Sequence, residues 1–417
     1  MLFLILTTLL FIWTFYDLYW KRRNFPPGPT PLPLFGNLLE VYYNCPGYEA
    51  FRKWNKQYGS IYTYWISTLP VVSISDYETL KETMIKDGEK YAGRWFFADF
   101  VKDFKGGEYG IVNSEGDLWR DQRRLTLHTL RDFGMGKNIM EERVMVEVDF
   151  LLERMAAQKD ISVQNEMDIA VGSVINGILF GYRFDESSED FVESYLKEWE
   201  RRKGTRQEEY FFERQLEALV FDVWSAGMET TSNTLTWAIV YILNHPEVQQ
   251  KIHEELDRVI QSDRKITMAD KNSLTYVNAV VSEVQRLANL LPQNLFRQTT
   301  EEVTLNGYKI PAGTIIVPQI SCVLYDEKVF PEPYKFKPER FLNKDGSLKV
   351  FPELVPFSVG KRQCPGEGLA RVELYLFVAN IFQKFRLSAK KLPSIEKSMS
   401  VVVIAKPFTC QAEERHQ

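Results

Sequence analysis

One cysteine in a loop with glycines on both sides constrains this chain more than any other feature. The loop has the sequence FSVGKRQCPG, residues 357–366, in which Gly360 and Gly366 flank Cys364 and Arg362 precedes it by two positions. Glycine reaches backbone conformations that side chains forbid, so such a loop can bring amide N–H groups close to a sulfur atom. Amides and a cation near sulfur favour the thiolate, which is the form that binds a soft metal. Cys364 is therefore predicted to be a single metal ligand.

The other cysteines support this prediction by elimination. The chain has only four cysteines in 417 residues: Cys45, Cys322, Cys364 and Cys410. They form no CxxC pair and no Cys/His cluster with the spacing of a zinc site. A chain of this length does not need a disulfide scaffold. The three cysteines outside the loop are interpreted as small buried hydrophobic residues.

The spacing Phe357-x-x-Gly360-x-Arg362-x-Cys364-x-Gly366 resembles the haem-binding signature of the cytochrome P450 family of monooxygenases. The resemblance implies that the Cys364 thiolate is the axial ligand of the iron of haem b. It also implies that Phe357 packs near the sulfur and the porphyrin, and that Arg362 meets a haem propionate. Gly360 and Gly366 would shape the loop around the cofactor.

A run of small and polar residues, AGMETTSN at 226–233, lies within the longest predicted helix, which extends from about Gln215 to Asn244. Small and polar residues are unfavourable inside a helix. Segments whose residues do not suit their secondary structure are expected at functional sites. Ala226 and Gly227 would let a flat ligand approach the backbone. The alternative is a simple kink in a buried helix.

The same run resembles the family's [Ala/Gly]-Gly-x-[Asp/Glu]-Thr-Thr motif. The resemblance implies that Glu229 and Thr230 are the catalytic pair that delivers protons during oxygen activation. It also implies that Trp119, Arg123 and Arg297 contact haem propionates. Buried carboxylates are costly without cationic partners, so a doubly anionic cofactor needs such residues.

Two further segments, around 283–286 and at 338–341, predict a network of charged residues that stabilises the fold. Glu283 and Arg286 are three residues apart, which allows them to pair on one helix face, and ordinary surface pairing is the default interpretation. Together with the PERF segment at 338–341, they resemble the ExxR…PERF pair of haem-thiolate enzymes. That resemblance implies a network of Glu283, Arg286 and Arg340 that holds the cysteine-bearing region in place.

The amino terminus has the pattern of a membrane anchor. Residues 1–20 are nearly all apolar, and the basic triplet 21–23 follows directly. Twenty helical residues rise about 30 Å, which matches the hydrocarbon core of a bilayer. A cleaved signal peptide is the alternative, but basic residues before the run and small residues after it are missing. Residues 21–36 are predicted to form a basic and proline-rich hinge, either as an extended spacer or as an SH3-type ligand.

Residues 37–417 are predicted to form the haem-thiolate catalytic domain, mainly α-helical with a small β portion, in a P450-type fold. Helices are expected at 45–57, 76–87, 116–130, 139–157 and 162–178, and strands within 60–74, 302–317 and 399–404. The resemblance is interrupted near residue 189, where family members carry further helices that form the roof of the substrate pocket. An internal deletion is predicted there, and exposed apolar surface with it.

These observations predict a membrane-anchored monooxygenase of the microsomal, family-2 type at the endoplasmic reticulum, with its catalytic domain in the cytosol. It would insert one atom of O2 into a small apolar substrate such as a xenobiotic, fatty acid or steroid. NADPH–cytochrome P450 reductase, with cytochrome b5 as a further partner, would supply electrons. A net charge of −5 argues against nucleic-acid binding. The alternatives are a reductase-independent haem-thiolate isomerase or dehydratase, and a non-catalytic haem-binding remnant.

Overall fold

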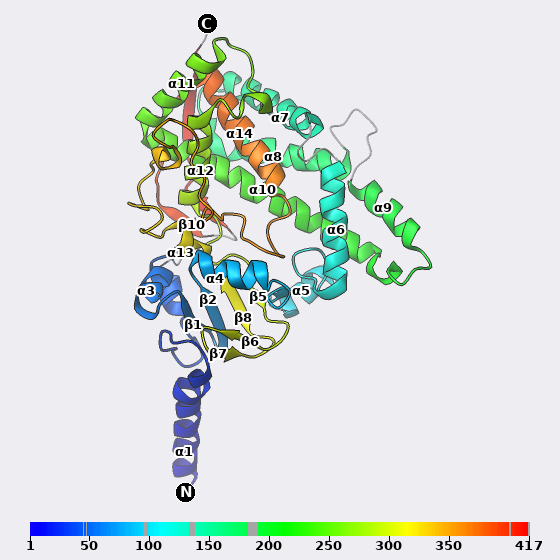
Figure 1. Ribbon diagram of the computed structural model, residues 1–417, viewed down its shortest axis with the longest axis vertical. Helices are drawn as coiled ribbons and strands as arrows, with labels where there is room; N and C mark the ends of the chain where they lie inside the picture. Colours follow the sequence, from blue (N-terminus) through cyan, green and yellow to red (C-terminus); the bar gives the residue numbers. More distant parts are fainter. Residues whose placement is uncertain are drawn as a thin grey trace. The chain divides into compact units, whose positions relative to one another are not determined.

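The computed structural model describes residues 1–44, 46, 48–95, 98–132, 138–181, 191–399 and 402–415. These residues form two compact units. Unit 1 consists of residues 1–96, 291–329 and 355–363, and unit 2 of residues 97–290, 330–354 and 364–417. Figure 1 shows that helices dominate and that the sheets are small, as the sequence predicts.

Unit 1 contains short helices and most of the strands. Its helical segments are α1 (Leu2–Phe15), η1 (Tyr16–Trp20), η2 (Lys21–Asn24), α2 (Leu38–Tyr43), α3 (Tyr48–Tyr58), α4 (Tyr77–Leu80), η3 (Lys81–Lys86) and α13 (Ile320–Leu324). Its strands are β1 (Ile61–Ile66), β2 (Leu69–Ile74), β3 (Gly93–Arg94), β5 (Arg297–Gln298), β6 (Val303–Leu305), β7 (Tyr308–Ile310) and β8 (Ile315–Pro318).

The main sheet of unit 1 has the strand order β1-β2-β8-β5-β3. Strands β1 and β2 form an antiparallel hairpin, whereas β2 pairs with β8 in parallel, with Val71 opposite Ile315. The β-branched residues of β2 and β8 fill the core on both faces of the sheet. This arrangement places β5, which begins with Arg297, between β8 and β3.

The proline-rich segment after η2 packs against the hairpin of unit 1. The Thr63 N–H donates to the Pro27 carbonyl at 3.1 Å. A Cβ at Gly28 would meet the Thr63 carbonyl oxygen at 1.8 Å, so only glycine allows this approach. This part of the proline-rich segment therefore packs within unit 1, and the function of residues 21–36 as a hinge stays a prediction.

The first 24 residues are helical throughout, with α1 continuing into one π turn and one 3-10 turn. Large apolar side chains of α1 are exposed, among them Phe3 (79%) and Phe11 (71%). In the described part of the chain, we find no helix whose length and apolar character together would suffice for a membrane crossing.

Unit 2 holds the long helices. They are α5 (Ala98–Lys105), α6 (Gly116–Asp132), α7 (Asn138–Ala157), α8 (Val163–Phe180), α9 (Phe191–Arg202), η4 (Glu208–Tyr210), α10 (Glu213–Asn244), α11 (Pro246–Ile260), η5 (Met268–Asp270), α12 (Thr275–Ala288), η6 (Pro338–Phe341) and α14 (Glu367–Lys384). Its strands are β4 (Ile161–Ser162), β9 (Phe385–Ser388), β10 (Lys397–Met399), β11 (Val403–Ala405) and β12 (Thr409–Glu414).

The 32-residue helix α10 is the centre of unit 2 and packs against α8, α12 and α14 (Figure 1). Every residue from Thr231 to Leu243 is buried, because this half of the helix is surrounded by other helices. Pro246 begins α11 as predicted, since proline has the backbone φ of a first helical turn and its missing N–H costs nothing there.

Glu283 and Arg286 of α12 form a buried ion pair. Arg286 Nε donates to Glu283 Oε2 at 2.7 Å, and neither side chain has exposed surface. Arg340 Nε of η6 donates to Glu283 Oε1 at 3.1 Å, and Arg286 also donates to the Pro333 carbonyl. The structure thus confirms the network and excludes the surface pairing that is the default for such spacing.

Candidate functional site

Cys364 lies just before α14, and its thiol is exposed to solvent. Of the other cysteines in the described residues, Cys322 and Cys410 are buried, as the sequence predicts. Cys45 lies outside the described residues. Within the described chain, the thiol of Cys364 is therefore the one that an external ligand can reach.

Opposing effects act on this thiol. Desolvation by the surrounding protein raises the pKa of Cys364, whereas the backbone N–H groups of Gly366 and Glu367 and the Arg123 guanidinium lower that pKa. Desolvation is the largest of these effects, so the pKa of Cys364 is raised overall, and the amides and the guanidinium are the contributions that favour the thiolate. Gly366 has an ordinary φ of −89°, so its contribution to the loop is its N–H group and not a special conformation.

Trp119 and Arg123 lie one turn apart on α6. The Arg123 guanidinium lies 5.8 Å from the centre of the Trp119 ring, and Trp119 is buried. Burial lowers the pKa of Arg123, and the interaction with Cys364 partly reverses this effect. The structure therefore brings together three residues that the sequence analysis assigned to one cofactor.

Helix α10 continues without a break through the segment 226–233. The polar side chains bond back to carbonyl groups one turn earlier. Thr230 Oγ1 donates to the Ala226 carbonyl at 2.7 Å, and Asn233 Nδ2 donates to the Glu229 carbonyl at 2.8 Å. These bonds satisfy side chains that otherwise compete with the helix backbone. Ala226 is exposed and Thr230 is half-buried, so a ligand could reach both.

Gly227 lies on the side of α10 that faces α8. A Cβ at Gly227 would meet Ile175 Cδ1 of α8 at 2.6 Å, so this glycine permits close packing of the two helices. Burial and the nearby Asp168 carboxylate raise the pKa of Glu229. A carboxyl group with a raised pKa can hold and release a proton closer to neutral pH than an ordinary glutamate does.

In unit 1, the loop 355–363 is held tightly against η3. Gly360 has a φ of +78°, and a Cβ there would lie 1.8 Å from the Met84 carbonyl oxygen. Both the conformation and the space therefore require glycine. Phe357 is half-buried in the same loop.

Two buried arginines of unit 1 support this loop. Arg297 of β5 donates to Ser358 Oγ at 2.9 Å and to the Val359 carbonyl at 2.8 Å. Arg362 donates through Nε to the Ala92 carbonyl at 2.8 Å. In this structure, both arginines thus fix the backbone that leads to Cys364, a function that the sequence analysis did not assign to them.

The sequence analysis also missed Asp222, which lies one turn before Ala226 on α10. Its carboxylate pairs with Lys105 at the end of α5 and accepts the N–H groups of Ile111 and Val112 at 2.9 and 3.0 Å. A Cβ at Gly110 would meet Asp222 Oδ2 at 2.1 Å. An acid inside a long amphipathic helix was the available signal, but the segment that it binds is more than 100 residues away in sequence.

Comparison with known proteins identifies the family. The Cytochrome P450 family model matches residues 26–202 and 185–412. The chain belongs to the cytochrome P450 family. It is 34% identical to Cytochrome P450 2H2 of Gallus gallus, with 89% of each chain covered. It is 33% identical to Cytochrome P450 2E1 of Oryctolagus cuniculus, with 88% of this chain and 89% of the relative covered.

As a P450, the chain is a monooxygenase whose haem iron is ligated by a cysteine. The described residues fit this cofactor, because an exposed thiol with amide N–H groups directed at it is the donor that haem-thiolate iron requires. The Arg123 guanidinium interacts with that thiol and lies over the Trp119 ring, and a flat ligand with carboxylates needs such a cation and aromatic surface.

The P450 match is interrupted within the chain. The two matched segments overlap at residues 185–202, so the family model breaks there. The alignment with the Gallus gallus relative has 442 positions but takes in 89% of 417 residues, about 371, so about 70 positions have no counterpart in this chain. Residues 182–190, where the sequence analysis predicts an internal deletion, lie outside the described residues.

Proposed function

We propose that this P450 hydroxylates small apolar molecules, such as xenobiotics, fatty acids or steroids, with electrons from NADPH delivered by a membrane flavoprotein reductase and, in part, by cytochrome b5. The single observation that carries this proposal is the exposed Cys364 thiol with its directed amides. Bound haem b would supply the oxygen-activating chemistry. The family-2 relatives support the microsomal type.

The residues of this chain would have distinct functions. Cys364 binds the iron, and Trp119, Arg123, Arg297 and Arg362 hold the propionates or the loop beside them. Phe357, Gly360 and Gly366 shape the cysteine loop.

In α10, the exposed Ala226 lines the approach to the cofactor, whereas Gly227 allows α10 to pack closely against α8. Glu229 holds a proton, and its raised pKa supports this function. Thr230 presents a hydroxyl one turn after Ala226 and would hold or pass a proton at its Oγ1.

Residues 1–20 would anchor the protein in the endoplasmic reticulum membrane by a single pass, with the catalytic domain in the cytosol. The exposed apolar side chains of α1 and the basic triplet 21–23 support this proposal. Alkaline carbonate extraction of the full chain and of a chain that begins at residue 21 tests it. Equal extraction of both proteins would contradict it.

A second candidate is a haem-binding protein without coupled turnover. The interrupted family match favours it, as does the apolar surface on the first half of α10, where Phe221 (42%) and Trp224 (37%) are exposed. A pocket without its cover admits water, and water near the cofactor diverts electrons from the substrate.

Spectroscopy of the full chain, loaded with haem, tests the proposed function. The reduced, carbon monoxide-bound protein should show a thiolate-type Soret band, and Cys364→Ser should abolish it. Cys322→Ser and Cys410→Ser are matched controls and should keep the band. An unchanged band in Cys364→Ser would overturn the assignment of Cys364. Reductase-supported NADPH consumption that increases with an apolar substrate supports the enzyme, and a band without such consumption supports the second candidate.

A further inference from the structure

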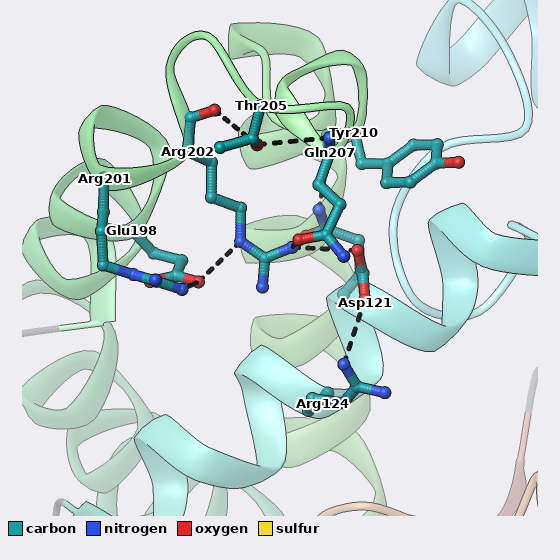
Figure 2. A network of polar contacts seen from close by, with 9 residues as sticks. Asp121, Arg124, Glu198, Arg201, Arg202, Thr205, Gln207 and Tyr210 are labelled. Atoms are coloured by element: carbon teal, nitrogen blue, oxygen red, sulfur yellow. Dashed lines mark hydrogen bonds and ion pairs between the residues drawn. The ribbon is translucent and has the colours of Figure 1, made fainter.

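The segment that follows the interrupted match is attached to the helix that carries Trp119 and Arg123. Helix α9 ends at Arg202, and η4 follows it at Glu208–Tyr210. Both elements contact α6 within unit 2. Figure 2 shows the polar side chains at this contact, with Arg202 between Glu198 of its own helix and Asp121 of α6.

Arg202 is the centre of this contact. Its Nη1 donates to Asp121 Oδ2 at 2.9 Å and to Gln207 Oε1 at 2.8 Å, and its Nε donates to Glu198 Oε1 at 2.7 Å. The side chains of Arg202 and Asp121 are only 9% and 8% exposed. The guanidinium also lies 4.8 Å from the centre of the Phe211 ring. An arginine with this many buried partners has one well-defined position.

The neighbouring residue of α6 makes a second bond to the same segment. Gln122 has no exposed surface, and its Nε2 donates to the Tyr210 carbonyl at 2.7 Å. The hydroxyl of the fully buried Tyr195 of α9 lies near Gln122 and Phe212. Two consecutive positions of α6 are therefore bound by residues 195–212.

Of the two bound positions, Asp121 lies away from the cofactor side of α6. Successive helical residues are about 100° apart, so Asp121 lies roughly 160–200° around the axis from Trp119 and Arg123. One side of α6 therefore presents Trp119 and Arg123, and the opposite side is held by Arg202. A displacement of α6 on the held side would move the other side by a similar amount.

From this arrangement we infer that Arg202 is a positioning residue for the cofactor site: through Asp121 it holds α6 where Trp119 and Arg123 meet the haem carboxylates. This inference rests on the proposed function of those two residues. Without Arg202, the buried Asp121 carboxylate would be left with a longer ion pair to the exposed Arg124, at 3.6 Å, and α6 would shift to hydrate it. A binding site loses affinity for its ligand when the residues that hold its contacting side chains in position become less ordered.

The test is the rate at which haem leaves the full-length holoprotein, measured by transfer to excess apomyoglobin. Coupling between partners in one ion-pair network corresponds to a change of about tenfold, so Arg202→Met should lose haem about tenfold faster than the parent protein. Arg201→Met is the matched control. Arg201 is adjacent and pairs with the same Glu198 at 2.6 Å, but its side chain is 68% exposed. Equal rates in the two variants would overturn the inference.

A second measurement separates positioning from general loosening. The same proteins are loaded with haem dimethyl ester, which lacks the carboxylates that Trp119 and Arg123 would bind. The difference between Arg202→Met and the parent should then disappear. If the variant loses the ester faster by the same factor, Arg202 acts on overall stability and the inference fails.

Asp121→Asn keeps the size of the side chain and removes its charge. This variant tests whether the Arg202–Asp121 pair positions α6 if Arg202→Met does not fold. It should accelerate the loss of haem and not of the ester, and parental rates with both cofactors would contradict the inference. Failure of the proposed function has a different signature. In that case Cys364→Ser keeps the thiolate-type band, whatever the exchange rates of the Arg202 and Asp121 variants.

Discussion

Glu283 accepts two hydrogen bonds from the guanidinium of Arg286, at 2.7 and 2.9 Å, in a place where neither side chain reaches solvent. Its Oε1 also accepts from the Lys337 N–H and from Arg340, so one carboxylate joins α12 to the segment 331–340. A buried ion pair of this kind contributes little net stability compared with a hydrophobic replacement, but removal of one partner is costly.

Replacement of Glu283 by alanine should therefore destabilise the protein strongly, because two arginines would remain buried without their carboxylate. We expect a loss of about 3–5 kcal/mol in the free energy of unfolding, measured by urea denaturation followed by far-UV circular dichroism. Glu339→Ala is the control, since its ion pair with Lys251 is partly exposed and such pairs contribute about 0–1 kcal/mol. Similar losses in both variants would contradict the structural assignment.

Gly360→Ala should disrupt the cysteine loop. The substitution places a Cβ at 1.8 Å from the Met84 carbonyl oxygen and adds the strain of a φ of +78°. Strain of that kind alone costs about 1–3 kcal/mol. Gly346→Ala is a matched control, because its φ is +81° but no atom lies within 4 Å of the added Cβ. We expect Gly360→Ala to lose the thiolate-type Soret band while Gly346→Ala keeps it, and equal spectra would show that the loop can move.

Thr230→Ala should leave the cofactor bound and divert electrons to peroxide. The hydroxyl would otherwise pass protons during oxygen activation, and general acid catalysis contributes about 10²–10⁴-fold to such steps. The measurement is hydrogen peroxide formed per NADPH consumed with the reductase present. Thr234→Ala is the control, because Thr234 makes the same kind of bond, to the Thr230 carbonyl at 2.8 Å, but is buried in the helix core. Unchanged coupling in Thr230→Ala would remove this residue from the mechanism.

Glu373 of α14 should give the protein a pH-dependent stability. Burial raises the pKa of Glu373 to about 8, with an opposing hydrogen bond from Thr231. The folded protein therefore holds this proton at pH values where the unfolded chain has released it. The contribution is favourable below the unfolded pKa and is lost as pH rises toward about 8.

Glu373→Gln should consequently remove part of the fall in stability between pH 5 and pH 8, as measured by urea denaturation across that range. Glutamine has a similar size and carries no charge at any of these pH values. Glu339→Gln is the control for the loss of a carboxylate elsewhere in unit 2. Parallel stability curves for Glu373→Gln and the parent protein would show that Glu373 does not titrate in this range.

Most elements were predictable because their signals are local. The helices at 116–132, 138–157 and 163–180 agree with their predicted ranges within a few residues, and so does α10. The predicted helix at 76–87 divides into α4 and the π-helical η3, and Gly360 closely approaches the Met84 carbonyl within η3. The hydrophobic period of the sequence does not distinguish an α-helix from a π-helix.

The sequence by itself was enough to predict the family, Cys364 as the candidate ligand and the helices around it, since a motif spacing and a helical period each lie within a short stretch of chain. Only the tertiary structure decided that Glu283 and Arg286 are buried, that Gly227 faces α8, and that Arg202 pairs with Asp121 across 81 positions. The physical reason is that burial and long-range pairing depend on which surfaces pack together, and packing is a property of the whole chain and not of any window within it.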